Sequence, residues 1–294
     1  MVSKPRSPDP ERTSARLPLV SQPAQSDEVL LAAARAGDKR ALEALLERHQ
    51  QQVYRFGMKM CRDPEDAKDV LQDTLLAMAR GVRDFRGSSS ISTWLYTIAR
   101  SFCIKKRRRR QFAPEEERSL DTDEARQLAA PGADPDEALA GKQVERALAR
   151  AIAALEPSYR EVLVLRDVEG LTAPEVAEVL GVSVQAVKSR LHRARLEVRE
   201  RVAPLLSVEP TPPASPTCPD VLRMYSQHLE DEISAKQCAE MEDHLEGCAR
   251  CRGTCDSLKR TLALCRTAGP SVPVPAAVQA SVKTALRAFL AENA

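Results

Sequence analysis

The sequence predicts an all-α protein built from several small helical units. Aromatic residues make up only 3% of the chain, and the alternating β-branched residues typical of strands are scarce. Apolar residues instead recur every three or four positions, as expected for amphipathic helices. Proline (20) outnumbers glycine (11) and gathers in short stretches, which predicts linkers. A chain of 294 residues is long enough for two or three domains.

The charge balance limits the kinds of partner. The 44 Lys and Arg residues nearly cancel the 42 Asp and Glu residues, giving a net charge of +2, so any nucleic-acid binding must come from local basic patches.

No apolar run approaches the roughly 18 residues of a membrane span, and the N-terminus lacks the apolar core of a secretory signal. We therefore expect a cytoplasmic protein with no membrane partner. We find no nucleophile–base pair, phosphate loop or catalytic carboxylate pair, and expect no enzyme.

The first part of the chain predicts a tail followed by a helical domain. Residues 1–24 hold five prolines among polar residues, which indicates a disordered tail. Residues 25–111 form the first helical domain. Asp63 and Pro64 mark a helix start there, because Asp63 can cap the free N–H groups and proline fits the first helical position.

The helix predicted over residues 91–110 combines aromatic and basic side chains. Trp94, Tyr96 and Phe102 precede six consecutive basic residues at 105–110. Aromatic faces can stack on unpaired bases while cations follow a phosphate backbone. Trp94 and Phe102 also fit a helix core, and a charge run is usually a solvated face, so both interpretations stay open. Cys61 and Cys103 lie in apolar helical patterns, where a buried, unreactive thiol is the simplest interpretation.

A second helical domain is predicted over residues 142–203, after an acidic, proline-containing linker at 112–141. Thr172 and Glu175 form a capping box, Gly181 can end the first short helix, and Ser183 can cap the second. Two short helices with a three-residue turn predict a helix-turn-helix whose second helix enters a major groove. Basic residues from 188 to 201 suit phosphate contacts. The candidate DNA-contacting residues are Ser183, Gln185, Lys188, Ser189, Arg190, His192 and Arg193. The alternative is an ordinary helical hairpin with a solvated basic face.

A Cys-rich segment at 218–268 follows a proline-rich linker at 204–217 and holds six of the eight cysteines. His244, Cys248 and Cys251 have the spacing of ligands to one tetrahedral ion, with Cys218 or Cys238 as the fourth. A thiolate-only site with Cys255 would suit copper, cadmium or zinc. Residues 269–294 predict a C-terminal amphipathic helix, centred on 276–290.

Several stretches together resemble the extracytoplasmic-function (ECF) group of sigma-70 factors. These are Asp66-Ala67-Lys68-Asp69-Val70-Leu71-Gln72-Asp73-Thr74, Phe85-Arg86-Gly87, Thr93-Trp94-Leu95-Tyr96-Thr97-Ile98-Ala99-Arg100, and Gly181 to Arg195. The resemblance implies that the first domain binds core RNA polymerase through helix 66–78, with Asp66, Asp69, Gln72 and Asp73. It implies that Trp94, Arg100, Lys105, Lys106 and Arg107 capture the melted −10 strand of promoter DNA. Helix 183–196 would then read the −35 element.

The segment 218–260 resembles the zinc-binding anti-sigma domain. This resemblance implies zinc held by Cys218, His244, Cys248 and Cys251, and a helix 276–290 that wraps onto the sigma domains. Cys238, Cys255 and Cys265 are then surplus and are candidate sensor thiols. One hypothesis is a metal- or redox-responsive regulatory domain that contacts the sigma domains of its own chain. The other is a constitutive structural zinc module, or one that recruits another protein.

Overall fold

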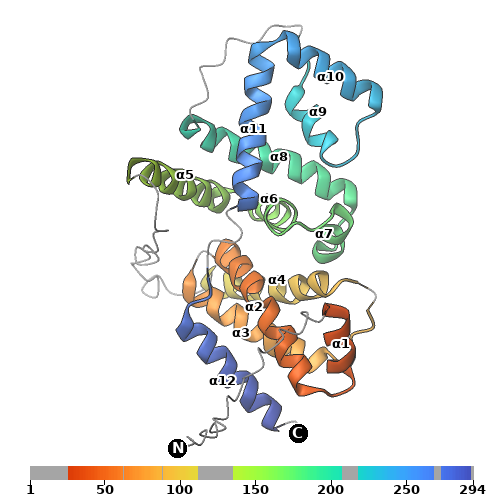
Figure 1. Cartoon of the computed structure of the whole chain (residues 1–294), viewed down its shortest axis with the longest axis vertical. Coiled ribbons are helices and arrows are strands. Elements are labelled where there is room, and N and C mark those ends of the chain that lie inside the picture. Colours follow the sequence, from red (N-terminus) through yellow and green to blue (C-terminus); the bar gives the residue numbers. More distant parts are fainter. Residues whose placement is uncertain are drawn as a thin grey trace, which may run out of the picture.

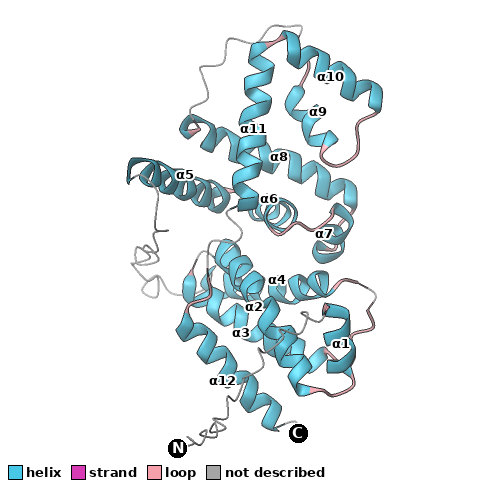
Figure 2. Cartoon of the chain, viewed as in Figure 1, coloured by secondary structure: helices cyan, strands magenta, loops and turns pink. Residues whose placement is uncertain are grey.

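The computed structural model describes residues 26–61, 63–87, 89–111, 135–206, 218–267 and 273–292, and every regular element in these ranges is a helix (Figure 2). The all-α prediction is confirmed. Three helical units follow one another along the chain, and the last helix lies apart from the third unit (Figure 1). Of the helices described, none is long and apolar enough to cross a membrane.

The N-terminal bundle is formed by four helices: α1 (Asp27–Arg35), α2 (Lys39–Cys61), α3 (Pro64–Gly81) and α4 (Ile91–Gln111). The start of α3 is as predicted, because the Asp63 carboxylate accepts hydrogen bonds from the N–H groups of Glu65 (2.8 Å) and Asp66 (3.1 Å). Fully buried side chains from three helices, including Leu45, Leu71 and Leu95, form the core.

The helix-turn-helix unit contains α5 (Pro135–Ala154), α6 (Pro157–Leu163), the π-helical turn η2 (Val164–Val168), α7 (Ala173–Leu180), α8 (Val184–Val202) and the 3-10 turn η3 (Ala203–Leu205). The predicted capping box between Thr172 and Glu175 is present. Gly181 ends α7 with a φ of +67°, the left-handed conformation that favours glycine, and Ser183 caps α8. These local signals set the angle between α7 and α8.

The helix α5 begins earlier than the sequence suggested. Pro135 opens it, so residues 135–141 are helical and do not belong to the acidic linker. The reason is that proline breaks a helix interior but is well suited to its first turn, where no N–H partner is needed. The predicted tail 1–24, linker residues 112–134 and linker residues 207–217 lie outside the described residues.

The Cys-rich module consists of α9 (Val221–His228), α10 (Ala235–Gly247) and α11 (Ala249–Thr267). Its long helix α11 packs across α8 of the helix-turn-helix unit (Figure 1). The last helix, α12 (Ala276–Glu292), leaves this module and packs against α3 at the other end of the molecule. Its apolar face joins the core cluster of the N-terminal bundle, because Val278, Val282 and Leu286 are buried there.

Candidate functional site

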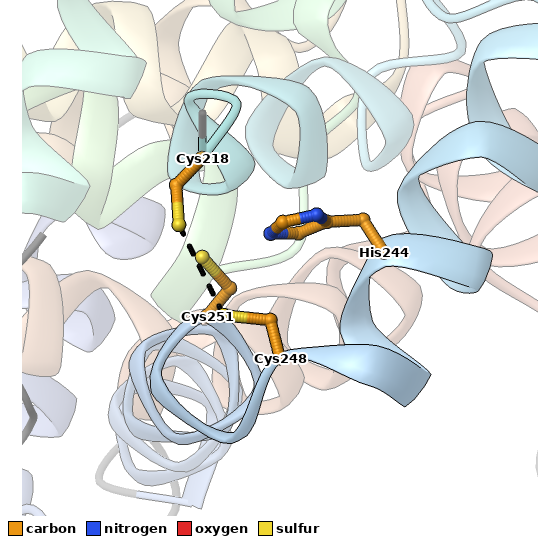
Figure 3. Close-up of side chains that lie close together, drawn as sticks. All are labelled: Cys218, His244, Cys248 and Cys251. Carbon is orange, nitrogen blue, oxygen red and sulfur yellow. Dashed lines mark hydrogen bonds between the residues drawn. The ribbon is translucent and has the colours of Figure 1, made fainter. Parts of the chain in front are cut away.

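Four side chains that could bind a metal ion meet where α9, α10 and α11 converge (Figure 3). Cys218 precedes α9, His244 lies in the last turn of α10, Cys248 ends that helix, and Cys251 lies in the first turn of α11. The break at Cys248, where the backbone becomes extended, turns the chain so that both thiols of the Cys-x2-Cys pair face one point. All four ligand atoms lie within 4.8 Å of one another.

The geometry and chemistry of this cluster fit zinc. Tetrahedral zinc with Zn–S bonds of about 2.3 Å holds its sulfurs about 3.8 Å apart. The Cys218 and Cys248 sulfurs are 3.9 Å apart. The His244 ring points toward the thiols, and its buried Nε2 has no hydrogen-bond partner within the described part of the chain. Of the two candidates for the fourth ligand, Cys218 rather than Cys238 lies with the other three.

The local environment shifts the pKa values of two cluster thiols in opposite directions. The backbone N–H of Cys251 is the main reason that the pKa of Cys248 is lowered. Burial, followed by hydrogen bonding with the neighbouring thiols, raises the pKa of Cys251 to about 12. A divalent cation would reverse this second effect, because a coordinated thiol is deprotonated.

The three surplus thiols differ in accessibility. Cys255 and Cys265 are fully buried, and burial raises the pKa of both thiols, that of Cys265 to about 12. Such thiols are poor nucleophiles. Cys238 is half-buried, and its sulfur lies 3.7 Å from His228 Nδ1 and 3.7 Å from Glu242 Oε1. Of these three candidate sensor thiols, only Cys238 is therefore accessible to solvent.

The candidate DNA-contacting residues of α8 fall into two groups. Gln185, Ser189 and Arg193 are exposed, as is the capping residue Ser183. The remaining three, Lys188, Arg190 and His192, are half-buried. Burial lowers the pKa of His192, which therefore favours the neutral imidazole.

Lys188 is held by the turn between α9 and α10. We call Glu230, Asp231 and Glu232 the acidic turn. Lys188 Nζ donates to the Glu230 carbonyl oxygen (3.0 Å) and pairs with the Glu232 carboxylate (3.2 Å). A carboxylate thus lies beside a cation that the sequence assigned to a DNA phosphate.

Arg195, one of the basic residues of α8 that we expected to contact phosphates, is buried in this structure. Its side chain is only 2% exposed and makes two hydrogen bonds to Asp167 (2.7 and 2.8 Å) and one to Glu230 (2.7 Å). Arg199 likewise donates to Ser257 of α11. The pattern contained a signal for this, because Arg195 is four residues after the inward-facing Leu191 and so shares its face.

Three of the five candidate strand-binding residues of α4 are also engaged, namely Trp94, Arg100 and Lys106. The Trp94 ring stacks on Phe85 with 4.6 Å between centroids, and Arg100 Nε donates to Glu161 of α6 (3.0 Å). Lys106 pairs with Asp66 and Asp69, so two candidate polymerase-binding residues contact a candidate DNA-binding one. Lys105, Arg107 and Asp73 are exposed, and Gln72 is half-buried.

Glu169 is a residue that the sequence analysis missed. It follows η2, its side chain is fully buried, and it accepts hydrogen bonds from Arg55 Nε (2.9 Å) and the Tyr96 hydroxyl (2.8 Å) of the N-terminal bundle. Burial, reinforced by the Glu169 charge, raises the pKa of Tyr96 well above its usual value. With the Arg100–Glu161 pair, Glu169 joins the N-terminal bundle to the helix-turn-helix unit. The π-helical turn η2 directly precedes it, and such turns are frequent at functional sites.

Three family models match the chain, and they match the three units in order. The model described as "Sigma-70 region 2" matches residues 45–113, and "Sigma-70, region 4" matches residues 145–198. The model described as "Putative zinc-finger" matches residues 218–252.

Curated proteins with similar sequences carry sigma-factor names. ECF RNA polymerase sigma factor SigM of Mycobacterium tuberculosis is 36% identical over 171 residues, which cover 58% of this chain and 82% of that protein. RNA polymerase sigma factor YlaC of Bacillus subtilis is 32% identical, covering 55% of this chain and 92% of that protein. The structure of CnrH in complex with the cytosolic domain of CnrY matches with a TM-score of 0.45 and 27% identity, over 63% of this chain and 100% of that one.

Proposed function

This chain belongs to the ECF family of RNA polymerase sigma factors, and we propose that its Cys-rich module regulates promoter recognition from within the same chain. In this proposal the N-terminal bundle binds core RNA polymerase and the −10 strand, and α8 reads the −35 element. Zinc held by Cys218, His244, Cys248 and Cys251 keeps the module folded. The metal supplies structure there, by fixing four ligands from separate segments around one point.

Promoter recognition by the two sigma domains needs no covalent chemistry. Exposed Gln185, Ser189 and Arg193 on α8 are suited to base edges and phosphates. Trp94 and the cations of α4 would bind unstacked bases better than duplex, at about 1–3 kcal/mol for each stacked base. For this to happen, Trp94 must exchange its partner Phe85 for a base, and Arg100 must leave Glu161.

The acidic turn is the observation that carries the regulatory part of the proposal. The Lys188 ammonium group pairs with the Glu232 carboxylate and donates a hydrogen bond to the Glu230 carbonyl oxygen. On the same helix, Arg195 donates a hydrogen bond to the Glu230 carboxylate. At Lys188, these oxygens take the place that a DNA phosphate would otherwise have. The module and DNA would therefore compete for one helix.

The metal cluster and the acidic turn belong to the same short segment. Cys218 leads into α9, the acidic turn follows α9 directly, and α10 then carries His244 and ends at Cys248. A bound ion fixes both ends of this segment and so holds the acidic turn against α8. Loss of the ion, or oxidation of its thiols, would free the turn and favour an open form.

Promoter-directed transcription with core polymerase tests the proposal. We expect the full chain with Cys248→Ser and Cys251→Ser to contain less zinc and to give several-fold more transcript than the zinc-loaded wild type. Cys238→Ser, which removes a thiol outside the cluster, is the matched control and should behave as wild type. Equal output from all three proteins would reject regulation and support a constitutive structural module. No transcript from any of them would reject the sigma activity itself.

A further inference from the structure

Two cysteines of the N-terminal bundle touch although they are 42 residues apart. The Cys61 thiol lies 3.3 Å from the Cys103 sulfur. Cys61 is the last residue of α2, and Cys103 lies in the middle of α4. Neither belongs to the metal cluster, and both were expected to be inert, buried thiols. Their contact depends on the packing of α2 against α4, which no local pattern shows.

The two thiols have different access to reagents. Cys61 is half-buried, whereas Cys103 is only 5% exposed. The hydrogen bond with Cys61 and burial together raise the pKa of Cys103 well above its usual value. A reagent from solution would therefore meet Cys61 first, and Cys103 would react second with whatever forms on Cys61.

A disulfide between Cys61 and Cys103 needs a further approach of their sulfurs, which lie 3.3 Å apart. A disulfide has an S–S bond of about 2.05 Å, so the sulfurs must move together by about 1.3 Å. Cys61 lies at the end of α2, where the backbone can adjust without breaking helical hydrogen bonds on both sides. Phe56 of α2 and Tyr96 of α4 pack with ring centroids 5.3 Å apart and hold the same two helices together.

We propose that the thiols of Cys61 and Cys103 react with small-molecule disulfides such as oxidised glutathione and thereby form a disulfide bond with each other. The Cys61 thiolate attacks one sulfur of the reagent, forms a mixed disulfide and releases one thiolate. Cys103, whose sulfur lies 3.3 Å from that of Cys61, then loses its proton, attacks the Cys61 sulfur and releases the second thiolate. Two protein thiols are oxidised to one disulfide, one small-molecule disulfide is reduced to two thiols, and the two protons pass to the released thiolates.

The bond would close a loop that contains the whole of α3. A cross-link over 42 residues restricts the unfolded chain and so stabilises the folded bundle. It would also fix the middle of α4, between Arg100 and the basic residues that follow Cys103. The N-terminal bundle would thus respond to thiol oxidation independently of the Cys-rich module.

Peptide mapping of the full chain tests this assignment. The zinc-loaded protein is treated with oxidised glutathione, remaining thiols are alkylated, and trypsin is added without reductant. We expect residues 60–62 joined to residues 101–105, with a mass two hydrogens below the sum of the two peptides. Cys61→Ser and Cys103→Ala should each abolish the joined peptide, and Cys238→Ser should retain it.

A second measurement separates a stable bond from incidental cross-linking. The oxidised wild type should unfold several degrees higher than the reduced protein, the gain should vanish with dithiothreitol, and Cys61→Ser should show no gain. Full alkylation of both cysteines after oxidation would overturn the proposal. Glutathione retained on Cys61 would overturn it too, because the second exchange would then not occur.

Discussion

Glu232 lies where the acidic turn meets α8, and its carboxylate is 3.2 Å from Lys188 Nζ. Both side chains are mostly covered, at 27% and 18% exposed, so the pair is less screened by salt than an ordinary surface pair. The neighbouring Asp231 has a positive φ of 54°, a conformation that Asp tolerates better than most residues. This geometry directs both flanking carboxylates toward α8.

We expect Glu232→Lys to increase the affinity of the full chain for a −35 duplex. The change replaces an attraction with a repulsion at Lys188. We expect the free energy of DNA binding to shift by about 1–2 kcal/mol, which corresponds to roughly 5- to 30-fold in affinity. Fluorescence anisotropy with labelled duplex measures it. Glu240→Lys makes the same charge change on exposed α10, beside Lys236, and controls for the added charge. Equal affinity for the two variants would contradict the role of the acidic turn.

Among the elements, α12 is the one that joins the C-terminus to the N-terminal bundle. Its apolar face packs on α3, the helix that contains the candidate polymerase-binding residues. Polar contacts flank that face: Lys39 Nζ donates to the Leu290 carbonyl (2.9 Å), Lys283 pairs with Glu47 (3.2 Å), and Arg80 lies over the Phe289 ring. A helix seated there would limit access to α3.

We expect Val282→Glu to release α12 and increase binding to core polymerase. Val282 is 6% exposed, and burying a carboxylate at this apolar position would cost about 2 kcal/mol or more, equivalent to more than tenfold. Ser281→Glu places the same charge on the adjacent, exposed position and is the control. Surface-captured polymerase reports the affinity. A Val282→Glu protein that binds no better than Ser281→Glu would show that α12 does not limit access.

At the scale of the whole molecule, buried charges hold the two sigma domains together. Glu169 from one domain is enclosed by Arg55 and Tyr96 from the other, and the Arg100–Glu161 pair lies on the same interface. In this closed arrangement the candidate −10 and −35 residues share one compact body. We propose that the two domains separate when both promoter elements are bound.

We expect Glu169→Gln to open the full chain. Loss of the carboxylate leaves the largely buried Arg55 without its charge partner, which costs about 3 kcal/mol, or about a hundredfold in the closed-to-open equilibrium. Small-angle X-ray scattering should then show a larger radius of gyration. Glu178→Gln, on an exposed position of α7, should leave it unchanged. An unchanged radius for Glu169→Gln would mean that other contacts suffice to hold the domains.

The sequence alone determined the helical class, the order of the three units and several helix starts. The Asp63 cap, the Thr172–Glu175 box and the Gly181 exit were all predicted and all present, because each depends on residues within one turn of the chain. Cys248, Cys251 and His244 were predicted as candidate metal ligands in the same way, because the three residues lie within eight positions of the sequence and their spacing is itself typical of metal ligands. The start of α5 at Pro135 was missed because proline fits the first turn of a helix but disrupts a helix interior, so its presence alone does not distinguish a helix start from a linker.

Only the tertiary structure decided which of these side chains are already engaged. It selected Cys218 over Cys238 as the partner of His244, placed the acidic turn on Lys188, buried Arg195, and brought Cys61 to Cys103. It also seated α12 on α3 and enclosed Glu169. The physical reason is that these contacts join residues from 26 to more than 100 positions apart, so they follow from how helices pack and not from the local pattern that forms each helix.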